Sequence, residues 1–146
     1  LRERQEMARR VEEELKNYPE MEIIQTRDVE KARSDYSQPV MVDFLNANPQ
    51  IDGVFTINDP TARGAIAALK EAGRLEETKV VAIDGSDEGK DFIRAGEMVA
   101  SAAQDPEQIG TTCIETAYKL LAGEEVEENV VVPMSIITAE NVDEAD

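Results

Sequence analysis

Short apolar segments with the composition of buried strands alternate along this chain with segments that carry helix signals. Three of the apolar segments are residues 53–58, 80–84 and 99–104, and each is followed by a helix-like stretch. Alternation at intervals of about 20–30 residues is typical of right-handed βαβ crossovers, which place the strands in parallel. The sequence therefore predicts an α/β fold in which a mostly parallel sheet is flanked by helices. The length of 146 residues is enough for one packed core.

Two Asp-Pro pairs mark the starts of helices. In Asp59-Pro60 and in Asp105-Pro106, the aspartate is expected as the N-cap and the proline as the first helical residue. The first of these helices is expected to stop at Gly73. The second carries an apolar stripe with helical spacing, and we expect this stripe, its cysteine included, to lie in the core: Ile109, Cys113, Ala117 and Leu121.

The remaining elements follow from the same patterns. A helix is expected at residues 4–16, residues 40–47 are expected as the apolar part of a second helix that ends near Pro49, and residues 91–95 are expected to lie within a short helix. Strands are expected at residues 22–26 and 130–138. The first helix is amphipathic, and its apolar face is expected to point toward a core. Pro133 lacks the N–H that a central strand needs, so the last strand is expected at a sheet edge or a hinge. The tail from Asn141 onward is expected to be frayed.

The charge of the chain limits its partners. The formal net charge is −17, so the surplus of Lys and Arg that nucleic acids require is missing. Acidic runs such as residues 12–14 are interpreted as solvated helix faces, with adaptation to high salt as the alternative. No apolar run approaches the roughly 20 residues of a membrane span, and a signal peptide, if there is one, lies outside this chain. The single cysteine allows no intrachain disulfide.

The sequence offers little catalytic chemistry. It contains no histidine, and it has neither a Gly-Lys-Ser/Thr phosphate loop nor a Gly-x-Gly-x-x-Gly loop. Residues 84–89 are weakly similar to a calcium loop, but Ala95 stands where a bidentate glutamate is needed. We therefore expect no enzyme activity, no catalytic residue, no metal site and no cofactor.

Four polar residues stand at the ends of the predicted elements. Asn58, Asp84 and Gln104 follow predicted strands, and Arg4 lies near the start of a predicted helix. Ligands of such sheets bind beyond the carboxyl ends of the strands. The hydroxyls of a sugar both donate and accept hydrogen bonds, which these amide, carboxylate and guanidinium groups can match.

Each of these residues also has a purely structural interpretation. Asn58 and Asp84 are residue types that end strands and cap helices, and Gln104 is equally suited to a hinge. Arg4 by itself is a typical surface arginine of a helix. We interpret Asp59 only as a helix N-cap.

Four blocks of sequence resemble one known family. Residues 58–66, Asn-Asp-Pro-Thr-Ala-Arg-Gly-Ala-Ile, resemble the strand-to-helix junction of periplasmic sugar-binding proteins of the ribose/galactose type and of the LacI-type regulators that share their fold. Residues 80–86, 100–110 and 136–142 agree in order and spacing, and the last block favours the transport proteins. The resemblance implies that Arg4, Asn58, Asp84 and Gln104 hydrogen-bond a small sugar. Ile83 departs from the pattern, since ribose binders often have an aromatic residue there.

The resemblance also implies how the chain is organised. Residues 1–104 would form the C-terminal, flavodoxin-like lobe of a type I periplasmic binding protein, in which the first strand of the lobe and most of the N-terminal lobe are missing. Residues 105–123 would be a helix that crosses back toward the N-terminal lobe. Residues 124–146 would be the final hinge or edge strand and the tail. We therefore expect the chain to be one piece of a larger protein.

The function implied by the resemblance is transport. The protein would be the solute-binding component of an ABC transporter, in the periplasm or outside the cell, and lipid-anchored in a Gram-positive or archaeal source. It would clasp a sugar between two lobes and deliver it to the membrane permease. The alternative is the sugar-sensing effector domain of a LacI-type transcription regulator. An upstream signal peptide would favour the first, and an upstream helix-turn-helix the second.

Overall fold

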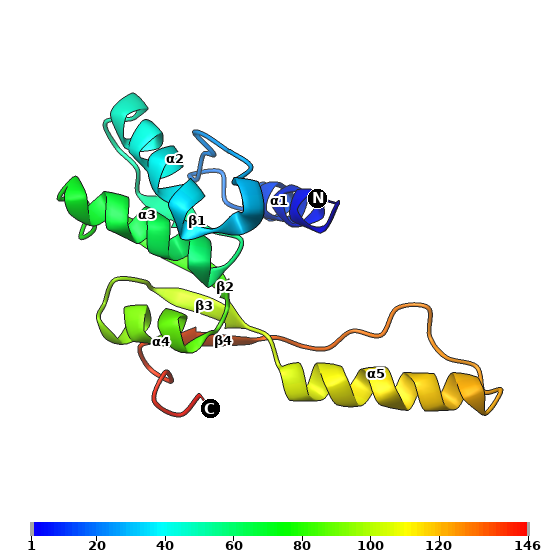
Figure 1. Cartoon of the computed structure of the whole chain (residues 1–146). Coiled ribbons are helices and arrows are strands. Elements are labelled where there is room, and N and C mark those ends of the chain that lie inside the picture. Colours follow the sequence, from blue (N-terminus) through cyan, green and yellow to red (C-terminus); the bar gives the residue numbers. More distant parts are fainter. Residues whose placement is uncertain (1, 146) are drawn as a thin grey trace.

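The computed structural model describes residues 2–145, and the side chains of residues 5–145. Its four strands form one sheet in the order β1-β2-β3-β4, in which β1, β2 and β3 are parallel and β4 is antiparallel to β3 (Figure 1). The predicted α/β class with a mostly parallel sheet is therefore confirmed. The elements in chain order are α1 (Arg2–Leu15), the 3-10 helix η1 (Glu30–Ala32), α2 (Ser34–Ala47), β1 (Gly53–Phe55), α3 (Asp59–Glu71), β2 (Lys79–Asp84), α4 (Asp87–Arg94), β3 (Ala100–Ala103), α5 (Pro106–Leu121) and β4 (Ser135–Thr138).

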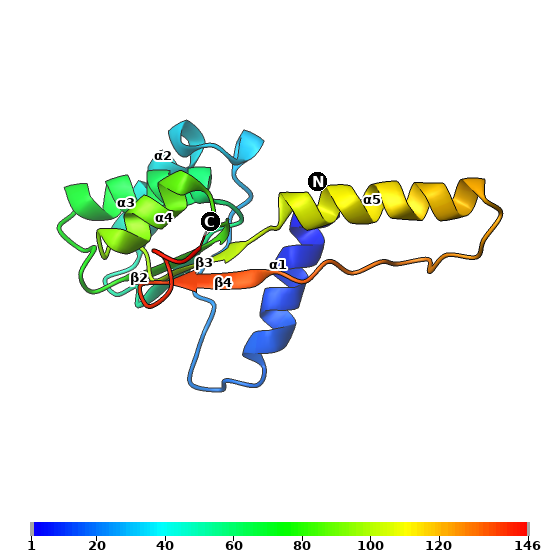
Figure 2. The same ribbon diagram turned by 90° about the horizontal axis from the view of Figure 1, so that it is seen from below.

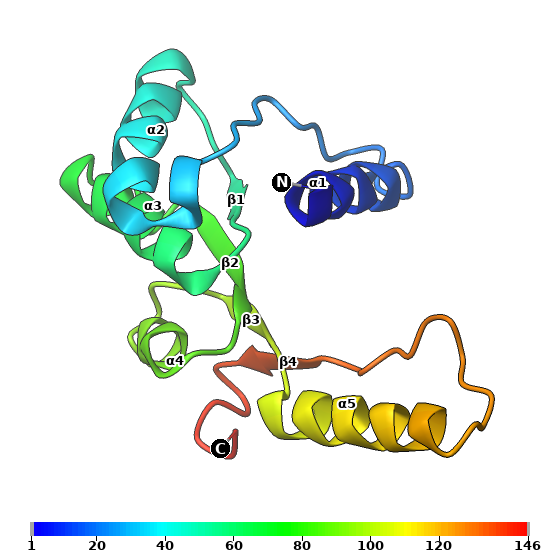
Figure 3. The ribbon, with the colours of Figure 1, turned by 45° about the vertical axis from the view of Figure 1, so that its right-hand side comes forward.

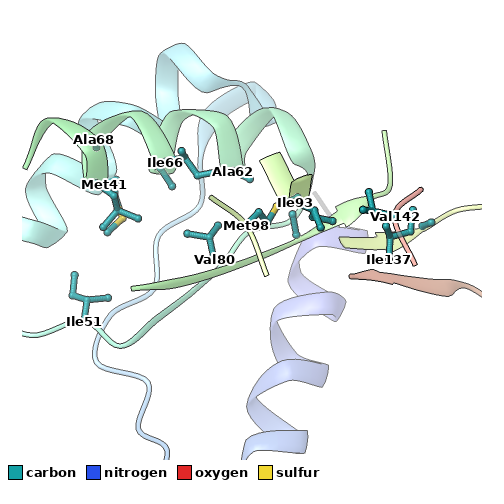
Figure 4. Packing of buried hydrophobic residues seen from close by; sticks show 14 residues of the cluster. Met41, Ile51, Ala62, Ile66, Ala68, Val80, Ile93, Met98, Ile137 and Val142 are labelled. Atoms are coloured by element: carbon teal, nitrogen blue, oxygen red, sulfur yellow. The ribbon is translucent and has the colours of Figure 1, made fainter. Parts of the chain in front are cut away.

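One face of the sheet is buried beneath helices. Helices α2, α3 and α4 lie together on one side of the strands (Figure 2). Alternate strand residues point into this layer, as the two-residue period of a strand requires. The apolar cluster that results lies between the sheet and helices α3 and α4, and α2 contributes Met41 to it (Figure 4). Its largest fully buried side chains are Ile66, Leu69, Ile93 and Val80.

The opposite face of the sheet is largely open. Phe55 of β1 and Ile136 of β4 are 43% and 55% exposed. Helix α1 lies on this side, away from the strands, and none of its described side chains joins the buried cluster (Figure 3). The expectation that the apolar face of residues 4–16 packs against a core is therefore wrong, although the helix itself forms as predicted.

The predicted strand at residues 22–26 does not form. These residues belong to no helix or strand and are exposed, and the side chains of Ile23 and Ile24 are about half accessible. The segment is apolar enough for a buried strand, but in the described structure it pairs with no strand, and β1 is left as an edge of the sheet. A strand needs a paired neighbour as well as a suitable composition, because its backbone groups must be hydrogen-bonded when they are buried.

Helix α5 forms where it was predicted, but it does not join the core. It has no buried residue, and Cys113 is exposed, so the placement of this cysteine in the core is wrong. The helix and the chain that returns from it project together away from the sheet (Figure 3). Its apolar residues Ile114, Tyr118 and Leu121 are 73%, 72% and 89% exposed. The helical period was correct, but it could not show whether a neighbouring layer exists.

The last strand and the tail differ in part from the expectation. Strand β4 begins at Ser135, two residues after Pro133, and it occupies an edge of the sheet as the proline predicted. The tail is not frayed, since Val142 is buried and Asp143 pairs with Arg94 of α4 at 3.0 Å. Helix α2 spans Ser34–Ala47 and contains the apolar part expected at residues 40–47. Helix α4 spans Asp87–Arg94 and contains the segment expected at residues 91–95 except its last residue, which is the C-cap.

Helices α2 and α3 approach each other closely at Gly64. A β-carbon added to Gly64 would lie 2.5 Å from the carbonyl oxygen of Ser34 and 2.8 Å from the backbone nitrogen of Gln38. Both neighbours are backbone atoms, which cannot move aside as a flexible side chain would. The glycine is therefore required by the distance between the two helices.

We expect Gly64→Ala to lower the free energy of unfolding by about 1–3 kcal/mol, because the extra methyl group forces α2 and α3 apart. Gly110→Ala is the matched control, since it also replaces a helical glycine but its added carbon would meet no atom within 4 Å. The control should keep or increase helix content. Urea unfolding followed by circular dichroism measures both variants. Equal stability of the two variants would contradict the close approach.

Candidate functional site

The carboxyl ends of β2 and β3 and the start of α3 meet at one edge of the sheet. Three of the four predicted site residues, Asn58, Asp84 and Gln104, lie here. The Gln104 side-chain amide donates to Asp84 Oδ1 at 3.0 Å, and its backbone N–H donates to the Asp84 carbonyl at 3.1 Å. The backbone N–H of Asp59, directly after Asn58, donates to the Asp84 carboxylate. The side chain of the fourth residue, Arg4, lies outside the described residues.

Asn58 acts as the N-cap of α3. Its Oδ1 accepts from the backbone N–H of Thr61 at 3.0 Å, and Thr61 Oγ1 in turn accepts from the Asn58 N–H at 3.3 Å. Its Nδ2 donates to the carbonyl of Ala32 at 3.2 Å. The structural interpretation of Asn58 is therefore correct in this structure. One amide hydrogen remains for a ligand, because Nδ2 carries two donors.

Asp84 has an unusual backbone and an unusual environment. Its φ is +125°, a region that residues with a side chain rarely adopt. Partial burial is the main cause that raises the pKa of the Asp84 carboxyl, and the negative charge of Asp59 raises it further. The hydrogen bonds from Asp59 and Gln104 lower this pKa but compensate only in part. Strain and a raised pKa both cost stability, and both are features that concentrate at functional sites.

Gly85 follows Asp84 and completes the tight turn out of β2. Its φ is +68°, and a β-carbon at this position would lie 2.7 Å from the backbone of Ala103 in β3. Its N–H donates to Ser101 Oγ at 3.0 Å. Only glycine fits here, since both the conformation and the space exclude a side chain.

Asp59 is the residue that the sequence interpretation missed. The N-cap is Asn58 and not Asp59, which is the first residue of α3 and is completely buried. Its Oδ2 accepts from the N–H and the hydroxyl of Ser86 at 2.8 and 2.7 Å, and its Oδ1 accepts from the Ser101 hydroxyl at 2.9 Å. A signal was present: Ser101 interrupts an apolar strand, and a hydroxyl that is buried in a strand needs an acceptor.

The site is an open surface and not an enclosed pocket. Two surface hollows of the described structure lie elsewhere, one between α5 and residues 125–130 and the other beside the end of α1. Among the side chains that the structure describes, no cluster of three or more His, Cys, Asp or Glu residues is arranged to hold a metal ion. Over the same part of the chain, no helix has the length and apolar character needed to cross a bilayer. The arrangement presents hydrogen-bonding groups from one side only.

Comparison with known sequences assigns the family. The profile described as the periplasmic binding protein domain matches residues 1–125. The chain therefore belongs to the periplasmic binding protein family. The ribose import binding protein of Escherichia coli is 39% identical over 98 residues, which are 67% of this chain and 33% of that protein. The xylitol-binding protein of Mycolicibacterium smegmatis is 32% identical over 136 residues, 92% of this chain and 38% of that protein.

Solved structures agree with the family. A periplasmic solute-binding protein of an ABC transporter from Actinobacillus succinogenes, with bound D-allose, superimposes with a TM-score of 0.80 at 26% identity. A carbohydrate transporter solute-binding protein from Agrobacterium radiobacter, in complex with D-arabinose, gives 0.78 at 29% identity. Each match covers 88% of this chain and 45% or 44% of the solved chain. This chain thus spans about a third of the curated relatives above and less than half of the two solved chains.

We expect stability to depend on pH through Asp84. Because the pKa of this carboxyl is raised in the folded state, the folded chain holds more protons than the unfolded chain between the two pKa values. The contribution of Asp84 to stability therefore falls as pH rises through this window and stays low above it. Asp84→Asn cannot ionise, so this variant should be more stable than the wild type at pH 7.

The advantage of Asp84→Asn should shrink as the pH approaches the ordinary aspartate pKa of 3.8. Urea unfolding at pH 7 and near pH 4 measures it. Asp52→Asn, at an exposed aspartate before β1, is the matched control and should show a smaller difference between the two conditions. If Asp84→Asn is less stable than the wild type by the same amount at both pH values, the expectation is wrong.

Proposed function

We propose that this chain is the sugar-contacting part of a solute-binding protein that supplies an ABC transporter. The observation that carries the proposal is the pairing of Asp84 with Gln104 at the carboxyl edge of the sheet, at 3.0 Å. The relatives support a sugar as the ligand, since their names refer to ribose and xylitol and the solved structures hold D-allose and D-arabinose. These names also favour transport over transcriptional regulation.

The polar groups at this edge retain unused hydrogen-bonding capacity. A carboxylate has about four acceptor positions, and Asp84 uses one for Gln104 and one for the Asp59 N–H. Gln104 is exposed and keeps its carbonyl oxygen and its second amide hydrogen. In the proposal, these groups accept from and donate to neighbouring hydroxyls of one sugar, with Asn58 and Arg4 as further donors.

The other side of the ligand requires a second lobe. The described site is open, and a sugar bound to one surface would keep most of its hydroxyls in water. In the proposal, residues 1–104 belong to the C-terminal lobe, residues 105–123 form a helix that crosses toward the N-terminal lobe, and residues 124–146 return as the edge strand and tail. The two lobes close on the sugar in the periplasm or outside the cell and deliver it to the permease.

Calorimetric titration of a two-lobed protein that contains this chain tests the proposal. The panel is D-ribose, D-allose, D-arabinose, xylitol and myo-inositol. At least one sugar should bind, and the isolated 146-residue chain should bind the same sugar far more weakly, because half of a clamp cannot remove it from water. No binding to any member of the panel would refute the sugar function.

Asp84→Ala in the same two-lobed protein should weaken sugar binding by about 2–4 kcal/mol, since the sugar hydroxyls and the Gln104 amide lose their acceptor. Its folding should be retained. Asp52→Ala is the control, because Asp52 is an exposed aspartate at the opposite edge of the sheet, where its partner is Gln50. Unfolding of Asp84→Ala would favour a turn-forming role for Asp84 instead.

A further inference from the structure

Asp59 carries a carboxylate that is buried without any exposed surface. Its bonded partners are the backbone N–H of Ser86 and the hydroxyls of Ser86 and Ser101, at 2.7–2.9 Å. A buried carboxylate is costly unless donors surround it. The three hydrogen bonds therefore indicate that Asp59 has a specific structural role.

The contacts of Asp59 surround the strained turn that holds Asp84. On one side of the turn, the Ser101 hydroxyl accepts a hydrogen bond from the Gly85 N–H at 3.0 Å and donates one to Asp59 Oδ1 at 2.9 Å. On the other side, Ser86 is tied to Asp59 through both its backbone and its side chain. The backbone N–H of Asp59 also donates to the Asp84 carboxylate itself.

Helix α4 adds to the same arrangement. Ser86 is its N-cap, and the hydroxyl that donates to Asp59 accepts from the Gly89 N–H at 3.1 Å. A β-carbon on Gly89 would lie 2.6 Å from the Asp59 carboxyl carbon, so the first turn of α4 sits directly against the carboxylate. The amino end of a helix, with its free backbone N–H groups, is a suitable neighbour for a carboxylate.

We propose that Asp59 is a positioning residue for sugar binding: its buried carboxylate holds residues 84–86 in their strained conformation and thereby aims the Asp84 carboxylate at the ligand. The inference rests on the sugar-binding function proposed above. A φ of +125° at Asp84 is unfavourable by itself and persists only when neighbouring groups hold it. The hydrogen bonds to Gly85 and Ser86 restrain the two residues that follow Asp84. Those of Ser86 are made with Asp59 directly, and that of Gly85 is made with the Ser101 hydroxyl, which in turn donates to Asp59.

Asp59→Asn is the first test variant, because it keeps the shape of the side chain and removes the charge and one acceptor. Two measurements detect the effect of this substitution on the turn and on sugar binding. In the 146-residue chain, the three-bond coupling between the amide and α hydrogens of Asp84 reports its φ and is small at the observed angle. In the two-lobed protein, calorimetry reports sugar affinity.

We expect the coupling to rise toward the large value of ordinary extended backbone, and the affinity to fall by about tenfold or more. Ser101→Ala is the second variant, which breaks the link to Gly85 while Asp59 keeps its charge, and it should change both quantities in the same direction. It decides the matter if Asp59→Asn fails to fold.

Thr78→Val is the matched control. Thr78 is also a buried hydroxyl, but it lies at the amino end of β2 and donates to the Ile51 carbonyl at 2.8 Å. This variant should lose stability without a change in the Asp84 coupling or in sugar affinity. If Asp59 served general stability alone, the two test variants would behave like this control and would lose stability with the Asp84 coupling and the sugar affinity unchanged.

The positioning role is overturned if folded Asp59→Asn and Ser101→Ala keep the wild-type coupling and the wild-type affinity. A wild-type protein that binds no sugar would instead refute the proposed function. In that case, a raised coupling in the variant chains would still support Asp59 as the residue that holds the turn, and an unchanged coupling would reject it.

Discussion

A negative charge buried at Asp59 sets the arrangement of the carboxyl edge of the sheet. The carboxylate belongs to α3, and its donors come from the start of α4 and from the middle of β3. In the chain, the whole of β2 separates α3 from both of these elements, so the charge can be buried only when the strand order is correct. Elements joined in this way cannot slide past one another without leaving a buried charge unpaired, which is far more costly than a small loss of apolar contact.

The same edge combines strain with solvent exposure. Asp84 has a positive φ and a raised pKa, and both properties reduce the stability of the folded chain. Gln104 beside it is exposed and is not required by the core. In the proposed function, ligand binding accounts for the strain and the raised pKa of Asp84. In the same proposal, the buried Asp59 carboxylate holds the turn, whereas the partly buried Asp84 carboxylate contacts the ligand.

The core is built on one face of the sheet only. Helices α2, α3 and α4 cover that face, whereas the apolar residues of α5 and much of the opposite sheet face remain exposed (Figure 2). Exposed apolar surface of this extent is typical of surfaces that contact another part of a protein or a partner. It agrees with a chain that spans less than half of the two solved family members compared above.

Local sequence determined most of the elements, and tertiary structure decided where they lie. The Asp105-Pro106 start of α5, the start of α3 to within one residue, the glycine at the end of α3 and the edge strand after Pro133 were all readable. Capping and proline geometry act over only a few residues. The positions of Asn58, Asp84 and Gln104 at one edge followed from parallel strand order. Whether residues 22–26 pair, or whether Cys113 is covered, depends on neighbours that local pattern does not encode. The role of Asp59 was hidden for the same reason, since its partners Ser86 and Ser101 come close only after three elements have packed.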